Sequence, residues 1–179
     1  MAVIDSQIIC TCSFRDEVKK IFGRFSQRDE EFCALAYAIA GTGIFYRCCE
    51  LTKVDIKREK SAVHLQMTRR QYRDEIRPEM KLRSWKARPV LIHSHPHDTP
   101  ELSPQDVLTY DQSREEKLSP LGAGEAYPVV LVCFPQAHQP KLCGFWIHEG
   151  CAYDVGVRLV SDFAPSVRRA WVAATQMKV

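Results

Sequence analysis

The chain has 179 residues, of which 45% are hydrophobic and 26% charged, a balance typical of one soluble globular domain with a real core. The formal net charge of +3 is too small to indicate a nucleic-acid partner. No signal peptide or long apolar run is evident, so we expect a cytoplasmic protein that has no membrane partner.

The eight cysteines include no C-x-x-C pair, which argues against a structural zinc knuckle. Most of them lie in apolar runs, where a reduced cysteine packs as a small hydrophobic residue. We therefore expect buried free thiols. A second metal site that includes Cys10-Thr11-Cys12 is the less favoured alternative.

Charge is distributed unevenly along the chain. Residues 53–88 contain twelve Lys/Arg and five Asp/Glu, so this segment has a formal net charge of +7 and the rest of the chain one of −4. A solvated helix over 68–80 with adjoining loops is the simpler interpretation. A basic face for an acidic partner is the alternative.

The N-terminal third predicts a strand over residues 3–12 and a helix over 14–25. Apolar residues recur at helical spacing in the second segment, and Ser13 is a suitable N-cap with Asp16 and Glu17 expected in the first turn. Two extended runs, at residues 30–40 and 44–51, then flank Gly41-Thr42-Gly43 and predict a hairpin. Four alternating alanines keep helix as the competing prediction for the first run.

The rest of the chain predicts an alternation of strands and helices. The expected strands are 62–67, 89–95, 129–134, 142–148 and 152–159, the last two forming a hairpin around Glu149-Gly150, and the expected helices are 104–117 and a tail over 164–176. Residues 118–127 contain Pro and Gly and predict a surface loop. The fold class is therefore mixed α/β.

Residues 93–106 gather metal-binding side chains at a usable spacing. His93 and His95 are two apart, so their imidazoles point to the same side of a strand. Ser103 and Pro104 resemble the N-cap and first residue of a helix, which places Asp106 in its first turn. Two imidazoles and one carboxylate make a three-ligand zinc site with a fourth position for water.

Zinc lowers the pKa of such a water from about 16 to about 7, but a general base is still needed to move its proton. Glu101 lies on the connecting loop beside the ligands and is a weak candidate. Pro96 breaks the alternation, so His97 is expected at the rim of the site rather than in a tri-histidine set. Asp98 is expected to be a solvated loop carboxylate.

His93-Ser94-His95-Pro96, Ser103 and Asp106 match the H-x-H-x(7)-S-x-x-D signature, so the chain resembles the JAMM (MPN-plus) zinc metalloproteases. Glu31-Phe32-Cys33-Ala34-Leu35 resembles the family's glutamate strand, although Ala34 stands where many members have glycine and the neighbouring Glu30 leaves the register open by one. The resemblance covers about residues 5–160 of a single domain, 1–179, with residues 161–179 as a helical tail.

The resemblance implies a mixed, curved β-sheet flanked by helices, related to the cytidine-deaminase-like arrangement. It implies one zinc ion per chain, bound by His93, His95 and Asp106. Glu31 would be the base that serves the water and then the leaving amine, and Ser103 would hydrogen-bond the developing oxyanion or the water.

Members of the family hydrolyse isopeptide or peptide bonds at the C-terminus of ubiquitin-like proteins. The short form resembles the prokaryotic branch, which implies a bacterial ubiquitin-like conjugation or antiviral pathway with its activating and conjugating enzymes as partners. Trimming of sulfur-carrier precursors and a non-catalytic MPN-type scaffold are the alternatives. A zinc deaminase is disfavoured, because H-x-E and C-x-x-C are absent. Residues 118–127 and 53–88 are the segments expected to recognise the partner.

Overall fold

The computed structural model describes residues 7–23, 33–50, 57–59, 62–64, 87–95, 99–115, 126–133 and 140–176. These residues form a mixed α/β fold, as predicted. The elements in chain order are β1 (Gln7–Thr11), α1 (Cys12–Phe22), β2 (Cys33–Ile39), β3 (Ile44–Glu50), β4 (Lys57–Glu59), β5 (Ala62–His64), β6 (Ala87–His95), α4 (Pro104–Glu115), β7 (Tyr127–Cys133), β8 (Lys141–His148), β9 (Cys151–Val160) and α5 (Pro165–Gln176).

Seven strands close into a barrel in the order β1-β3-β2-β6-β7-β8-β9, so the sheet is mixed as expected but is a closed barrel instead of the expected curved sheet. The cause is β9, which is long enough to pair with two strands. Its first half runs antiparallel to β8, and its second half runs parallel to β1, with Gln7 opposite Gly156 and Thr11 opposite Val160. Strand β9 thereby supplies hydrogen-bonding partners to both β8 and β1, which would otherwise be edge strands.

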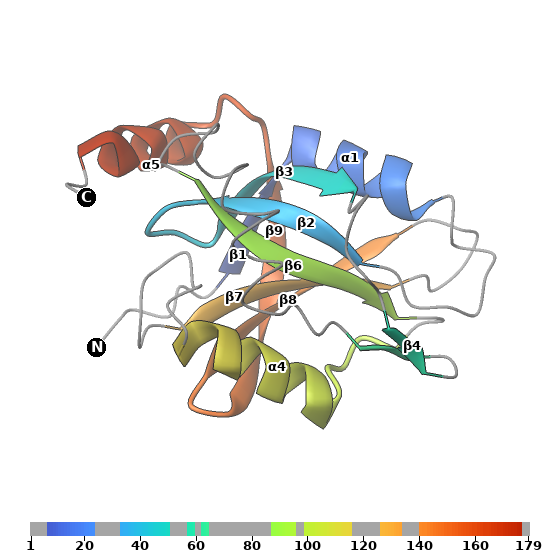
Figure 1. Cartoon of the computed structure of the whole chain (residues 1–179). Coiled ribbons are helices and arrows are strands. Elements are labelled where there is room, and N and C mark those ends of the chain that lie inside the picture. The colour runs from blue at the N-terminus through green and yellow to red at the C-terminus, as the bar shows by residue number, and fades with distance from the viewer. Residues whose placement is uncertain are drawn as a thin grey trace.

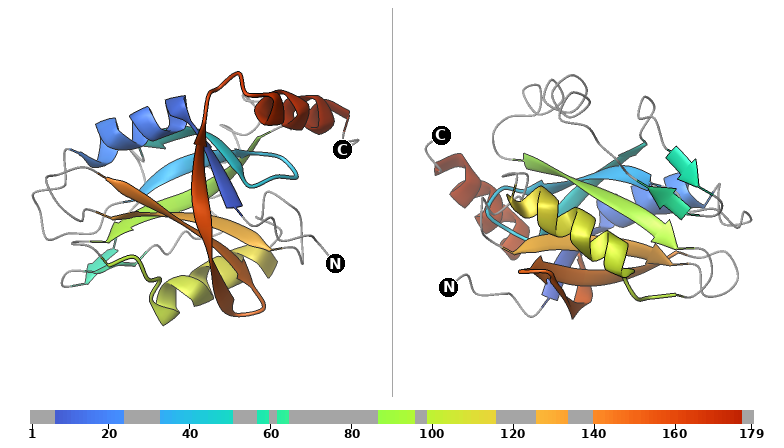
Figure 2. Two further views of the ribbon diagram at one scale, coloured as in Figure 1. Left: turned by 180° about the vertical axis from the view of Figure 1, so that it is seen from behind. Right: turned by 60° about the horizontal axis from the view of Figure 1, so that its bottom comes forward.

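Figures 1 and 2 show helices α1 and α4 on opposite sides of the barrel, with β6 between them. The predicted last hairpin is confirmed, and its turn is formed by Glu149 and Gly150, which both have positive φ angles. The predicted C-terminal helix is also confirmed as α5, whose Trp171 packs edge-on against Tyr46 of β3.

The start of α1 differs from the prediction. Its N-cap is Thr11, whose hydroxyl accepts a hydrogen bond from the amide of Phe14 at 3.3 Å, so Ser13 lies inside the helix. Consequently Asp16 and Glu17 lie beyond the first turn, which contains no acidic residue. Glu17 has another role, since its carboxylate accepts a 2.6 Å hydrogen bond from the amide of Cys48 and ties α1 to β3.

The alternation around residues 33–40 reflects a strand and not a helix. All seven residues of β2 are buried, and β2 pairs antiparallel with both β3 and β6. Its alanines, Ala34, Ala36 and Ala38, belong to the same core cluster as the apolar stripe of α1. Small side chains therefore suit a central strand that has close neighbours on both faces.

All eight cysteines are free, and Cys10, Cys33, Cys48 and Cys133 are buried. Burial raises the pKa of the Cys10 and Cys48 thiols, which keeps both protonated. Cys10 and Cys12 belong to no potential metal-binding group among the described residues.

Several predicted features lie outside the described residues, namely the charged helix at 68–80 and most of the loop at 118–127. The short hairpin of β4 and β5 falls within the basic segment. Within the ranges that the structure describes, no helix is both long and apolar enough to span a membrane.

Close packing at Gly43 provides a test of the fold. A Cβ atom at Gly43 would lie 2.8 Å from the buried ring of Trp146, whereas one at Gly156 would meet Gln7 only at 3.8 Å. We expect Gly43→Ala to lower the free energy of unfolding by about 1–3 kcal/mol through overpacking, and Gly156→Ala to cost clearly less. Urea denaturation of both variants checks this. An equal loss in the two would contradict the packing of Trp146 on Gly43.

Candidate metal centre

The two histidines lie at the end of β6, a strand that is held on both sides. His93 pairs with Cys33 of β2 and with Leu131 of β7, and His95 pairs with Cys133 of β7. The even spacing puts both imidazoles on one face. The residues are 4% and 7% exposed, so the strand presents two histidines that are almost fully removed from solvent.

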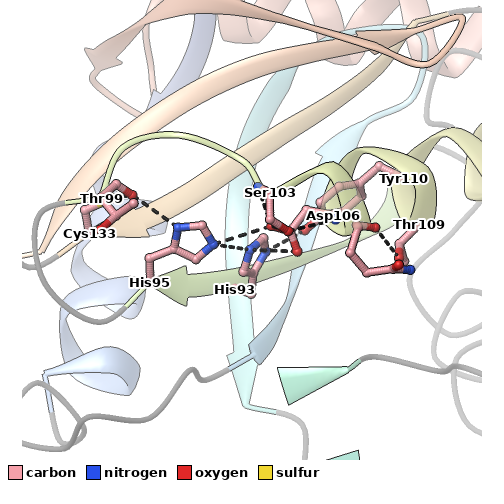
Figure 3. Close-up of polar contacts among 9 residues, drawn as sticks. His93, His95, Thr99, Ser103, Asp106, Thr109, Tyr110 and Cys133 are labelled. Carbon is pink, nitrogen blue, oxygen red and sulfur yellow. Dashed lines mark hydrogen bonds and ion pairs between the residues drawn. The ribbon is translucent and has the colours of Figure 1, made fainter. Parts of the chain in front are cut away.

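Helix α4 brings Asp106 to the same place. The helix starts at Pro104, as predicted, and Ser103 caps it: the Ser103 hydroxyl accepts from the amide of Asp106 at 3.2 Å, and the amide and hydroxyl of Ser103 donate to Asp106 Oδ2 at 2.8 and 2.6 Å. This reciprocal arrangement is a capping box with aspartate in the third position. The cap of the helix therefore also fixes the direction of the Asp106 carboxylate (Figure 3).

Three potential ligand residues converge between the strand and the helix, and each carboxylate oxygen of Asp106 faces one of the two imidazoles. His93 Nε2 lies 3.2 Å from His95 Nε2, His93 Nε2 lies 3.5 Å from Asp106 Oδ1, and His95 Nε2 lies 3.5 Å from Asp106 Oδ2. Tetrahedral zinc with bonds of about 2.0–2.1 Å requires its ligand atoms to be about 3.3–3.4 Å apart. The spacing and the imidazole-rich donor set thus fit zinc, and the three residues form a group that could bind a metal ion.

The outer nitrogen of each imidazole has a partner of its own. His95 Nδ1 donates to the carbonyl oxygen of Thr99 at 3.2 Å, and the same oxygen accepts from the thiol of Cys133 at 3.2 Å. His93 Nδ1 lies 2.9 Å from the hydroxyl of Tyr110. Contacts of this kind orient metal-binding histidines and select the ring nitrogen that faces the metal (Figure 3).

The Asp106 carboxylate is ionised in this environment. Burial alone would raise its pKa, but hydrogen bonds from His93 and His95, the charge of His93 and the Ser103 hydroxyl hold the pKa of Asp106 well below its ordinary value. A negative charge therefore lies against two imidazoles, which suits a cation between them.

Four of the predicted site residues come together, namely His93, His95, Ser103 and Asp106. Glu101 is exposed, as expected of a solvated loop carboxylate. Glu30, Glu31, His97 and Asp98 lie outside the described residues, so their predicted roles stay predictions.

Three further residues take part in the contacts around the group without having been predicted, namely Thr99, Cys133 and Tyr110. Tyr110 had a usable signal, because it follows Asp106 by four residues and so lies on the same face of α4. Thr99 contributes a backbone carbonyl, and Cys133 reaches the site through strand pairing, so neither leaves a side-chain pattern near the motif.

No protein-family model matches the chain, and no curated protein does. Among solved structures, the chain is similar to a Desulfitobacterium hafniense protein known from a solution structure, with a TM-score of 0.53 and 16% identity over 86% of this chain and 93% of that one. This likeness extends to the fold alone. A JAB1/MPN domain protein from Archaeoglobus fulgidus matches with a TM-score of 0.41 and 12% identity over 83% and 96% of the two chains, too weakly to carry an argument.

The convergence of the three ligand atoms predicts stoichiometric zinc uptake. We expect the wild-type protein to bind one zinc ion per chain, and His93→Ala or Asp106→Asn to abolish tight binding because two ligands cannot complete the site. Elemental analysis after dialysis measures this. His148→Ala is the matched control. His148 is the last residue of β8, its Nε2 faces the carboxylate of Glu149, and it does not belong to the group of His93, His95 and Asp106. Loss of zinc in His148→Ala as well would contradict the assignment.

Ser103 both caps α4 and orients the Asp106 carboxylate, and comparison with Thr11, which caps α1, separates these two roles. Ser103→Ala and Thr11→Ala should each lower the free energy of unfolding by about 0.5–2 kcal/mol, because each removes an N-cap. Only Ser103→Ala should also weaken zinc binding, because it frees the carboxylate of Asp106. Urea unfolding and zinc titration report the two effects. Equal zinc affinity in both variants would show that the cap does not orient Asp106.

Proposed function

We propose that the protein is a zinc-dependent hydrolase of JAMM type that cleaves the amide bond at the C-terminus of a ubiquitin-like protein. The observation that carries this proposal is the convergence of His93, His95 and Asp106 at spacings that suit tetrahedral zinc. Three protein ligands leave one position for water or substrate, which is typical of catalytic zinc sites, whereas structural sites use four.

His93, His95 and Asp106 would hold the zinc ion, whose Lewis acidity makes water nucleophilic near neutral pH and polarises an amide carbonyl. The remaining task is to move one proton. A base must take it from the water as the water forms a C–O bond to the carbonyl carbon. The base must then deliver the proton to the amine nitrogen as the C–N bond breaks. Asp106 is unsuited to this task, since its carboxylate accepts two hydrogen bonds from Ser103.

We assign the base to Glu31. It precedes Cys33 by two residues, and Cys33 lies opposite His93 in the β2–β6 pair. Side chains alternate along an extended chain, so an even separation from Cys33 would put Glu31 on the face of the two imidazoles and Glu30 on the other. An upstream continuation of β2 would therefore favour Glu31 over Glu30, both of which lie outside the described residues.

The predicted oxyanion role of Ser103 needs a change in its hydrogen bonding. The hydroxyl has one proton, and it is donated to Asp106 Oδ2 at 2.6 Å. The contact supports a role in orienting Asp106. Donation to a substrate oxygen would require the hydroxyl to turn away from that carboxylate.

The proposed substrate is a ubiquitin-like protein joined through its C-terminus to a lysine or to a following peptide. The expected setting is a bacterial ubiquitin-like conjugation or antiviral pathway, with trimming of a sulfur-carrier precursor as the alternative. Residues 53–88 and 118–127 remain the proposed recognition segments.

Cleavage can be tested with a ubiquitin-like protein encoded beside the gene, carrying a fluorogenic amide at its C-terminus. We expect the zinc-loaded wild-type protein to release the fluorophore, and Glu31→Gln to bind zinc normally but cleave at least about 100-fold more slowly, in line with the loss of a general base. Glu30→Gln is the matched control and should keep its activity.

Full activity in Glu31→Gln would move the base to Glu30 or Glu101. Zinc uptake without cleavage of any linear or branched ubiquitin-like substrate would favour the non-catalytic scaffold. Chelation of zinc should abolish cleavage and addition of zinc should restore it, because the ligands alone cannot activate water.

A further inference from the structure

Tyr110 is a buried tyrosine that reaches the candidate metal centre from α4. It is 4% exposed, and its hydroxyl lies 2.9 Å from His93 Nδ1. The Tyr110 and His93 rings are stacked, with centroids 6.0 Å apart and an interplanar angle of 29°. Because Tyr110 follows Asp106 by one helical turn, the same face of α4 brings both a carboxylate and a hydroxyl to His93.

The two nitrogens of His93 point at different partners. Nε2 faces His95 and Asp106, whereas Nδ1 faces the hydroxyl of Tyr110. A nitrogen that binds a metal must present its lone pair, so the proton of the neutral ring belongs on the other nitrogen. A hydroxyl oxygen accepts such a proton, and the nearly buried site leaves little solvent to replace it.

The neighbouring histidine has an equivalent contact made by the backbone. His95 Nδ1 donates to the Thr99 carbonyl, which can only accept, so in the neutral ring His95 Nε2 presents its lone pair to the group. Each imidazole is thus oriented from behind, His95 by a carbonyl and His93 by a tyrosine hydroxyl. Only the second contact can be removed by changing a side chain.

We propose that Tyr110 is a positioning residue of the metal site, which holds His93 in the orientation and Nδ1–H tautomer that metal binding through Nε2 requires. The inference rests on the zinc site assigned under the proposed function and adds a residue that touches neither the metal nor the substrate.

The chain offers a matched control in Tyr127. This tyrosine of β7 is also buried, and its ring centroid lies 5.6 Å from that of Tyr110. Tyr127→Phe therefore makes the same chemical change in the same cluster, one ring further from His93. It reports on the loss of a buried tyrosine hydroxyl and its contacts, whereas Tyr110→Phe also removes the contact with His93 Nδ1.

The test is the zinc affinity of the full chain, measured by competition with a chelator, for the wild-type protein, Tyr110→Phe and Tyr127→Phe. We expect Tyr110→Phe to bind zinc about 10–100-fold more weakly, the usual effect of removing a partner of a metal-binding histidine. Tyr127→Phe should keep the wild-type affinity. Urea unfolding of the metal-free proteins separates this effect from a general loss of stability.

Wild-type affinity in Tyr110→Phe would overturn the inference while leaving the zinc site intact. An equal loss in both variants would also overturn it, because the cause would then be the loss of any buried hydroxyl in the cluster and not the contact with His93 Nδ1. Failure of the wild-type protein to bind zinc would defeat both this inference and the proposed function.

A second measurement does not depend on the folding of a variant. Nitrogen-15 NMR of the zinc-loaded wild-type protein reports which ring nitrogen of His93 carries the proton. We expect a slowly exchanging Nδ1–H. A proton on Nε2 would mean that the metal is held through Nδ1, and would overturn the role of Tyr110.

Discussion

The site depends on the contact between one carboxylate of α4 and two imidazoles of β6. The Thr99 carbonyl keeps a proton on His95 Nδ1, which leaves His95 Nε2 to face His93 Nε2, 3.2 Å away, and the ionised Asp106, 3.5 Å away. Lone pairs and negative charge that converge in a nearly buried place are favourable only with a positive centre between them. A proton can fill that role, and zinc fills it with the geometry that the three residues already have.

The barrel makes this contact rigid. β6 is paired with β2 on one side and β7 on the other, and closure through β9 leaves neither sheet edge free to move away from its neighbours. The histidines therefore lie on a fixed strand, and the capping box of α4 fixes the carboxylate that faces them. Sites built on paired strands and helix ends hold their ligands more precisely than sites built on loops.

The sequence predicted what depends on local pattern. The spacing of His93 and His95 and the Ser103 cap each act over a few residues, and the structure has them as expected. The barrel could not be predicted, because β1 and β9 come from opposite ends of the chain and pair through backbone atoms that carry no side-chain signature. The start of α1 was predicted two residues too late, because Ser13 is also a good cap and the sequence does not show that β1 ends at Thr11, opposite Val160.

The most direct measurement is zinc X-ray absorption spectroscopy on the loaded protein, since the chain also contains four buried cysteines that could compete for the metal. Two imidazoles and a carboxylate predict a first shell of nitrogen and oxygen at about 2.0–2.1 Å, with the multiple-scattering signature of histidine. A sulfur shell at about 2.3 Å, or the same spectrum from a variant that lacks His93 and His95, would contradict the assignment of the metal to this site.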